Sequence, residues 1–573
     1  MRTAVGFAAF VAVFTSAGFG VLAPFVRLNR REVVLFAPLA YVAGIAATGT
    51  LLTVAVVLSV PLRLGTVLVA GSIVLASGLI AARRPRTRLA WRHERRSRFE
   101  WAITATAIVG VVVVLESAFR AARLEGLFGW DAGSFWVPKA EALALTGGLD
   151  ERHFTTLPGP SYPPLVPVLQ ASAFAFLGDV DPARLHLVYW TILAGATLGA
   201  AAILSRYASP ALAWTAVLLV AGAGEVVAHA LVPQGDFLMD VFLAFALVFV
   251  VVFVRERRWE AAALALPFAT AAVLTKREAL LYIGAMALAL AIATARRWRE
   301  TWPWAAMLAG MAVAVLVPWR LWTRSHSLPG PGPEAGGLGL LDHLDRLGPT
   351  LDLVLTTLFW PPSWSLVMVA VVGAVCASII AGREEGLLLG SFLALTIGAF
   401  LWVLWALPSV PLTRNASLNP VVRMCGAALV PCALCIPLLA QPILEPLRRR
   451  LAPGGMRAAA ATGGAVLAAA LAYPAIVLAV DGIPRFPSRN ECSDRIATAT
   501  PPFEVIYART SSYRQARAIH ERVVMLGFVD AQLLADGCGR WKVANLDVDT
   551  PEQLRGHLQD ARRVGYDPWI ERA

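Results

Sequence analysis

Long apolar runs separated by short polar segments recur along most of this 573-residue chain. A helix of about 20 apolar residues is long enough to cross the hydrocarbon core of a bilayer. The pattern therefore predicts a polytopic α-helical membrane protein with about 14 spans. The predicted spans cover residues 3–26, 33–60, 64–82, 101–119, 184–204, 209–232, 238–254, 260–275, 279–295, 303–322, 362–381, 387–407, 421–441 and 458–480.

Two further apolar segments are not predicted to cross the membrane. The stretch "SYPPLVPVLQASAFAFLG" (161–178) is short and begins with two prolines, which favours an interfacial or re-entrant helix. The segment 323–361 opens with the Pro- and Gly-rich "LPGPGPEAGG" and continues as "LLDHLDRLGPTLDLVLTTLF". That apolar stripe with interspersed acids suits a helix lying on the membrane surface.

The polar tail after Asp481 contains an internal repeat. Residues 503–528 align without gaps to residues 541–566, and each unit runs from a β-rich stretch through a capping Ser or Thr to an amphipathic helix. The two units predict a small α+β domain within 482–573. The pattern resembles SPOR-type cell-envelope domains, which have two such halves and bind peptidoglycan, so peptidoglycan is an expected partner. The alternative is a packing module against the membrane part.

Charge supports the membrane assignment and predicts the orientation. Only 15% of the residues are charged, compared with about 25% in soluble domains. The net charge of +12 comes largely from arginine blocks between predicted spans, which the positive-inside rule places in the cytoplasm of a bacterial-type plasma membrane. A nucleic-acid site is therefore not expected. The blocks are 27–31, 83–98, 255–258, 295–299 and 448–450.

With the arginine blocks inside, several polar segments face the opposite side. The predicted extracytoplasmic segments are the loops 120–183, 233–240, 275–278, 323–361 and 408–423, and the tail from Asp481. Of the six cysteines, Cys492 and Cys538 lie in this tail, and the other four lie in apolar runs. Because extracytoplasmic compartments are oxidising, we expect Cys492 and Cys538 to form a disulfide.

The first outer loop contains the clearest candidate for acid–base chemistry. In "GWDAGSFWVPKAEAL" (129–143), Asp131 follows a predicted span and is flanked by Trp130 and Trp136. Partial desolvation at an apolar boundary raises the pKa of a carboxylate and makes it a usable general base. Lys139, two helical turns further on, has a charge suited to a phosphate. The alternative is a juxtamembrane loop with an aromatic belt.

Other charged residues fall on the same predicted face. Asp236 and Asp240 stand at the mouth of a predicted span, where acids are costly and usually functional. Lys276 and Glu278 belong to "LTKREALL", which is either a functional outward turn or a solvated hairpin. Arg423 begins a span on the outer side, against the positive-inside bias. This predicts an anionic partner, which is either a lipid phosphate or a local acid.

Five motifs occur in the order typical of one enzyme class. They are "GWDAGSFWVPKAEAL", "SYPPLVPVLQA", "GDFLMDVFLAFAL", "LTKREALL" and "VPWRLW". The chain thereby resembles GT-C glycosyltransferases of the protein O-mannosyltransferase and aminoarabinose-transferase-like kind, which use polyprenyl-phosphate sugars. The resemblance covers roughly residues 100–425, the expected catalytic membrane module. Residues 1–99 then form extra helices with a basic cytoplasmic loop, and 426–481 the last membrane helices.

The resemblance implies inverting transfer of a hexosyl or pentosyl group from a polyprenyl-phosphate sugar to a cell-envelope acceptor at the outer leaflet. Asp131 occupies the position of the catalytic acid in the first outer loop, and either Asp236 or Asp240 matches a second acid. Because this loop has no Asp-Asp, Asp-Glu or DxD pair, the divalent metal of some relatives is not expected. The predicted substrate-binding residues are Trp136, Lys139, Lys276, Glu278 and Arg423.

Two other functions are compatible with a charged membrane protein. A transporter or flippase of lipid-linked saccharides predicts charges at mid-span and internal repeats in the membrane part, and neither is clear in the sequence. A non-enzymatic envelope anchor for the tail does not explain the acids between residues 131 and 240.

Overall fold

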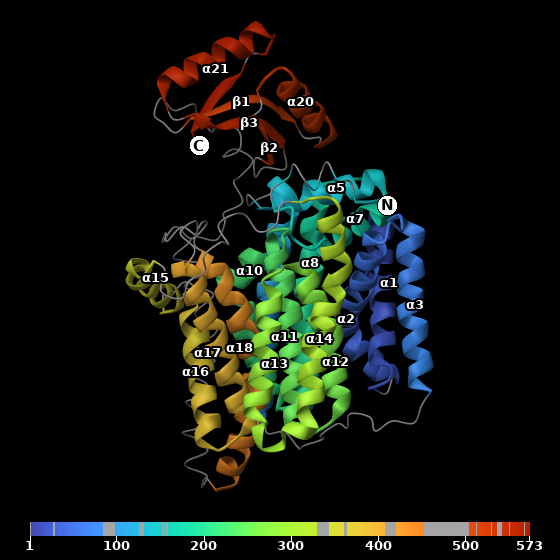
Figure 1. Ribbon diagram of the computed structural model, residues 1–573, viewed down its shortest axis with the longest axis vertical. Helices are drawn as coiled ribbons and strands as arrows, with labels where there is room; N and C mark the ends of the chain where they lie inside the picture. Colours follow the sequence, from blue (N-terminus) through green and yellow to red (C-terminus); the bar gives the residue numbers. More distant parts are fainter. Residues whose placement is uncertain are drawn as a thin grey trace.

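The computed structural model shows a helical bundle and a small α+β domain (Figure 1). The structure describes residues 2–26, 29–83, 98–124, 131–149, 151, 154, 157, 159–328, 343–359, 364–406, 420–450, 503–510, 513–528, 530–535, 541–548, 550–566 and 568–572.

The predicted polytopic helical architecture is confirmed. Within these residues, nine helices are long and apolar enough to cross a membrane. They are α1 (Arg2–Leu22), α2 (Arg30–Val57), α3 (Leu64–Ala82), α4 (Arg98–Leu124), α8 (Leu185–Tyr207), α11 (Gly235–Glu256), α14 (Trp298–Ser325), α17 (Glu384–Ala406) and α18 (Pro420–Arg450).

Four further predicted spans correspond to shorter or bent helices. The predicted span 209–232 is a pair, α9 (Pro210–Ala221) and α10 (Gly224–Leu231), bent by 63°. The other three are the short apolar helices α12 (Trp259–Thr275), α13 (Ala279–Ala293) and α16 (Ser365–Ile380). The fourteenth predicted span, 458–480, lies outside the described residues.

The segment 161–178, which the sequence predicts to be an interfacial or re-entrant helix, contains helix α7 (Leu165–Leu177). This helix is too short to span a bilayer. It packs against α1, α2 and α5 (Val137–Thr146), near one end of the bundle (Figure 1). Because nearly all of α7 is buried, its apolar sequence is explained by packing between helices. The predicted surface helix is α15 (Leu347–Phe359), at the side of the bundle in Figure 1.

Helix α11 runs through the middle of the bundle. Its most apolar window is entirely buried, and it packs against α12, α13, α17 and α18. A helix that is apolar on all sides belongs in the interior. The first turn of α11 therefore carries Asp236 to the buried end of a central helix.

Helices α1 and α2 are packed unusually closely. A Cβ atom on Gly18 would lie 1.6 Å from the Ala40 carbonyl oxygen, and one on Gly44 would lie 1.7 Å from the Phe14 carbonyl oxygen. Small residues that let helix backbones approach are typical of membrane helix interfaces. Helix α2 also packs against α8 and α12, and α1 against α7, so the N-terminal helices are part of the bundle.

The two ends of the bundle differ in charge. The turns that contain the arginines of 255–258 and 295–299 connect α11 to α12 and α13 to α14 at one end. Helices α5 and α7 and the first turns of α11 and α18 lie at the other end, which we call the site end (Figure 1). The alternation of helices along the chain thus separates these two arginine blocks from the site end.

The tail forms the predicted α+β domain. Its elements are β1 (Phe503–Thr510), α20 (Tyr513–Met525), β2 (Gln532–Ala535), β3 (Trp541–Val548), α21 (Pro551–Arg563) and β4 (Trp569–Arg572). The antiparallel sheet has the order β2-β3-β1-β4, as in split βαβ folds. Each repeat unit covers the first strand and the helix of one half, β1 with α20 and β3 with α21, while β2 and β4 follow the units. The capping box of Thr550 and Gln553 starts α21 as the sequence predicts.

Candidate active site

Four charged side chains from four separate elements meet at the site end of the bundle. Arg423, in the first turn of α18, donates from Nη2 to Oδ2 of Asp131 and, at 2.7 Å, to Oδ2 of Asp236. Lys276, in the turn between α12 and α13, donates from Nζ to Oδ1 of Asp236 at 2.8 Å. We call Asp131, Asp236, Lys276 and Arg423 the ion cluster.

Burial is uneven within the ion cluster. The Asp236 side chain is 3% exposed and has two cationic partners, whereas the Asp131 side chain is 19% exposed and contacts Arg423. A buried charge is tolerated when it is paired and hydrogen-bonded. Asp236 also lies in the first turn of α11, where the helix dipole favours an anion. Asp236 is thus held in place from several sides, and Asp131 is the more accessible acid.

Lys276 remains charged in this setting. Burial by itself lowers the pKa of the Lys276 ammonium, but the adjacent Asp236 carboxylate outweighs burial, and the pKa is raised. Its aliphatic stem is packed tightly, because a Cβ atom on Gly235 would lie 3.0 Å from Lys276 Cγ and 3.1 Å from Trp136 Cζ2. Glycine at position 235 therefore allows the start of α11 to approach both residues.

Aromatic rings line one side of the ion cluster. The Tyr162 ring stacks on Phe135 at 5.8 Å between centroids and lies 5.4 Å from the Trp136 ring. Lys276 Nζ lies 5.6 Å from the Tyr162 centroid, which is within cation–π range. Trp136 is 1% exposed, and its Nε1 donor has no partner among the described residues. This indole is therefore a buried donor beside the charges.

The "SYPP" segment is fixed to two other motifs. Ser161 Oγ accepts from Arg277 Nη1 at 3.1 Å, and its carbonyl accepts from Trp319 Nε1 of "VPWRLW" at 3.2 Å. Tyr162 donates to Glu278 Oε1 at 3.0 Å. Burial raises the pKa of the Tyr162 hydroxyl to about 12, so it remains a donor. The motif "SYPP" thus contacts both "LTKREALL" and "VPWRLW", which follow it along the chain.

Lys139 contacts a backbone carbonyl and two aromatic rings at the site end. Its side chain is buried under α5, where Nζ donates to the Gly159 carbonyl at 2.8 Å and lies 5.2 Å and 5.1 Å from the ring centroids of Phe135 and Phe154. Burial lowers the pKa of Lys139 to about 7. Gly159 has a φ of +60°, and a side chain there would meet Tyr162 at 2.7 Å. The contacts tie α5 to the loop that carries Tyr162.

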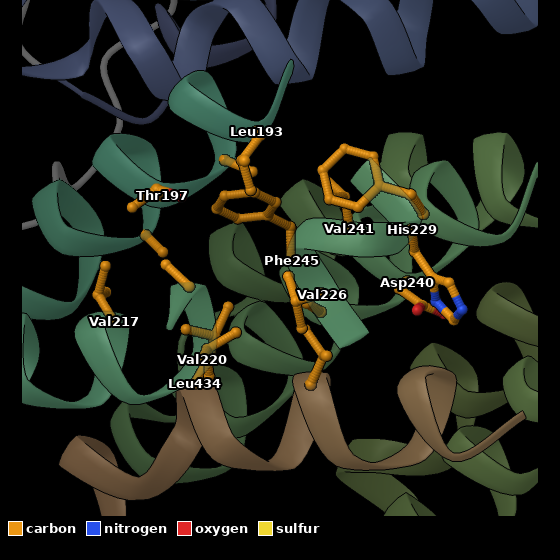
Figure 2. A pocket seen from close by; sticks show the side chains of 16 residues that line it. Leu193, Thr197, Val217, Val220, Val226, His229, Asp240, Val241, Phe245 and Leu434 are labelled. Carbon is orange, nitrogen blue, oxygen red and sulfur yellow. The ribbon is translucent and has the colours of Figure 1, made fainter. Parts of the chain in front are cut away.

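Asp240 lies one helical turn further along α11 than Asp236 and is not a member of the ion cluster. It is 5% exposed, its Oδ1 has no hydrogen-bond partner among the described residues, and its Oδ2 lies against Gly426 of α18. It lines an apolar cavity between α8, α9, α10, α11 and α18, and His229 of α10 lies beside it in Figure 2. The sequence left the choice between Asp236 and Asp240 open, and Asp236 is the acid that joins Asp131.

The tail domain contacts the site end of the bundle, because Glu141 Oε2 on α5 lies 3.7 Å from Arg517 Nη1 on α20. The contact agrees with the alternative interpretation of the tail as a module that packs against the membrane part. In the sequence, Ser161, Tyr162 and Trp319 stand out only as members of the motifs "SYPP" and "VPWRLW", whose order along the chain indicated a shared site. Trp130, Cys492 and Cys538 lie outside the described residues, so the predicted disulfide stays a prediction.

The donor set of the ion cluster does not suit a divalent cation. Both carboxylates are paired with Lys276 or Arg423, and a metal ion would have to displace these cations. Among the described residues, no group of three or more His, Cys, Asp and Glu side chains is arranged to hold a metal ion.

A bundle of apolar helices with acids and cations at one end is the architecture of a polytopic membrane protein with a charged site. Consistent with this class, a family model described as dolichyl-phosphate-mannose-protein mannosyltransferase matches residues 161–322. The matched region runs from "SYPP" to "VPWRLW" and contains Asp236 and Lys276, so it resembles membrane glycosyltransferases. No curated protein and no solved structure matches the chain significantly.

Proposed function

We propose that this protein is a membrane glycosyltransferase that moves a sugar from a polyprenyl-phosphate donor to a cell-envelope acceptor. The observation that carries the proposal is the ion cluster, in which Arg423 bridges Asp131 and Asp236 at the end of an apolar bundle. Such a site has a carboxylate to accept a proton and cations to bind a phosphate. Its position at the end of membrane helices suits a donor with a lipid tail. The family match to residues 161–322 supports the same class.

Asp131 is proposed as the general base. It is the more exposed acid of the ion cluster, and it can be reached by an acceptor hydroxyl that enters from outside the bundle. The acceptor oxygen would attack the anomeric carbon as its proton passes to Asp131, and the bond from that carbon to the phosphate oxygen would break. A single displacement of this kind inverts the anomeric centre.

Lys276 and Arg423 are proposed to bind the departing phosphate. Negative charge accumulates on the phosphate oxygens as the glycosidic bond breaks, and preorganised cations lower the energy of that state. Lys276 is nearly buried, and Arg423 is 30% exposed, so Arg423 is the cation with more room to move toward a ligand. Asp236 then has a positioning role. Its carboxylate accepts hydrogen bonds from Lys276 and Arg423 and keeps both cations in place and charged.

Trp136, Glu278 and Lys139 are proposed to shape the donor site. The Trp136 Nε1 donor and Glu278 Oε2, which has no partner among the described residues, can bond sugar hydroxyls. Lys139 is proposed to act indirectly, because its contacts fix Gly159 and, through it, the loop of Tyr162.

The site end is proposed to face the outside of a bacterial-type plasma membrane. This proposal is supported by the arginines of 255–258 and 295–299, which lie at the end of the bundle opposite the ion cluster. The positive-inside rule assigns an end rich in arginine to the cytoplasm. A cytoplasm-specific reporter fused after Ala573 should be silent. A strong signal from that fusion would contradict the orientation.

The direct test is transfer by purified protein in nanodiscs. Polyprenyl phosphates that carry radiolabelled hexoses or pentoses would be incubated with envelope fractions, and labelled product and free polyprenyl phosphate would be measured together. The proposal expects both to appear in equal amounts and to require the protein. Movement of intact donor across liposomes without release of polyprenyl phosphate would instead favour a flippase.

A SPOR-like tail predicts, in addition, that the protein is retained by peptidoglycan in a pull-down.

A further inference from the structure

The short segment that leads into the first turn of α11 is held by a buried polar network. Gln170 of α7 donates from Nε2 to the Pro233 carbonyl at 2.8 Å and to the Tyr189 hydroxyl at 3.2 Å. Tyr189 of α8 in turn donates to the Gln234 carbonyl at 3.1 Å. The hydrogen bonds therefore run in one direction, from an amide through a hydroxyl to the backbone that precedes Asp236.

The neighbouring carbonyl is also fixed from α8. His186 Nδ1 lies 2.6 Å from the Leu231 carbonyl oxygen, and His186 is one helical turn before Tyr189. Side chains from α7 and α8 thus hold three carbonyls between the end of α10 and the start of α11. Gln170, His186 and Tyr189 are 0–1% exposed. Buried polar groups on otherwise apolar helices are costly unless they are bonded, so these residues are not explained by burial alone.

We infer that Gln170 and Tyr189 are positioning residues for Asp236, and this inference rests on the proposed function. The Gln234 carbonyl belongs to the N-cap residue of α11, and Asp236 is two residues further on. On the other side, Gly235 is in close contact with Trp136 and Lys276. The segment is therefore held between the polar network and the ion cluster, and a shift of its backbone changes where the Asp236 carboxylate meets Lys276 and Arg423.

Two substitutions remove the network while preserving packing. Tyr189→Phe deletes the hydroxyl, and Gln170→Met deletes the amide donors at nearly constant volume. Removing one net hydrogen bond should lower kcat on the order of 10-fold, with a smaller change in KM, because the displaced group acts through Asp236. Since both residues belong to one chain of bonds, the double variant should lose little more activity than the more impaired single variant.

The chain offers a matched control that involves the same helix, α8. The Tyr41 hydroxyl on α2 bonds to Thr191 Oγ1 on α8 at 3.0 Å, and neither hydroxyl bonds to the segment 231–234 among the described residues. Tyr41→Phe therefore removes another buried hydroxyl and should change kcat less than twofold by the same reasoning. Equal losses of kcat in Tyr41→Phe and Tyr189→Phe, or a wild-type kcat in both network variants, would overturn the inference.

A second measurement separates this inference from the proposed function. Hydrogen–deuterium exchange of the amides at 235–238 should be faster in Tyr189→Phe and Gln170→Met than in the wild type and in Tyr41→Phe. This readout does not require sugar transfer. If the wild type transfers no sugar but exchange changes as expected, the positioning inference stands and the proposed function fails. If exchange at 235–238 is unchanged in both network variants, the positioning inference fails whatever the enzyme does.

Discussion

Lys276 Nζ lies 2.8 Å from Asp236 Oδ1, and both side chains are almost completely buried at 10% and 3% exposure. The two residues are 40 positions apart, with Lys276 in the turn after α12 and Asp236 in the first turn of α11. Their contact fixes the turn between α12 and α13 against the first turn of the central helix α11. The same contact places an ammonium next to the site where we propose that a phosphate binds.

Breaking this pair should destabilise the protein. Lys276→Met leaves the buried Asp236 carboxylate with Arg423 alone, and the loss of one partner of a buried pair typically costs about 3–5 kcal/mol. Thermal unfolding in detergent should show a clear drop in Tm for Lys276→Met and a smaller one for Arg277→Met, whose side chain is 35% exposed. The double variant with Asp236→Asn should be more stable than Lys276→Met alone. A double variant that is less stable than both singles would show that the pair is not the cause.

Arg423 should not be replaceable by lysine. Its Nη2 atom reaches both Asp131 and Asp236, whereas a lysine ammonium at the end of a shorter stem lacks the planar fork of guanidinium. Arg423→Lys should keep the fold but lower sugar transfer by about 10²-fold, the usual cost of one preorganised donor to a developing negative charge. The transfer assay in nanodiscs measures this directly, and a Lys variant with wild-type turnover would contradict the proposed role of the guanidinium.

The two acids of α11 should behave differently. Asp236 has both cationic partners of the ion cluster, while Asp240 lies a turn away against Gly426 and the apolar cavity. Asp236→Asn should therefore abolish most transfer, and Asp240→Asn should retain at least a third of it. Steady-state kinetics of the two variants, with thermal unfolding as the control for folding, compare them. The opposite order of activity would identify Asp240 as the second functional acid.

Lys139 should make stability depend on pH. Burial lowers its pKa to about 7 in the folded protein, compared with about 10.4 for an unfolded chain. Between these values the unfolded state binds more protons, so stability should rise as the pH increases from about 7 to about 10. Tm measured over this range should rise less in Lys139→Met than in the wild type. Glu141→Gln, on the same helix, should keep the wild-type slope; equal slopes in the wild type and Lys139→Met would contradict the assignment.

The fold was largely predictable because the order of apolar and charged residues along the sequence indicates which segments are membrane helices. Runs of apolar residues predicted the spans, and the tail repeat predicted one strand and one helix in each half of the tail domain, without the strands β2 and β4. The site was predictable only in part. Sequence order indicated Asp131, Asp236, Lys276 and Arg423, and the position of Arg423 predicted an anionic partner. It did not show which acids pair with which cations, because these residues approach one another only when α11 and α18 pack. Gln170 and Tyr189 stood within apolar runs, where a single polar residue has no periodic signal.

The role of Lys139 illustrates the same limit. Its spacing from Asp131 suggested a phosphate contact, because both residues belong to one short segment. The π-helical turn η1 (Ala132–Trp136) stands between Asp131 and α5, so the spacing of a regular α-helix does not apply from Asp131 to Lys139. In the structure Lys139 donates to the Gly159 carbonyl, a contact that the sequence spacing could not show.

The central claim is that Asp131 is the base of a sugar transfer at the ion cluster, and Asp131→Asn tests it most directly. Asparagine preserves the size of the side chain but cannot accept the proton, so single-turnover transfer from a bound polyprenyl-phosphate sugar should fall by about 10²–10⁴-fold. Donor binding and Tm should stay close to the wild-type values. An Asp131→Asn variant that binds the donor and transfers its sugar at nearly the wild-type rate would contradict the account.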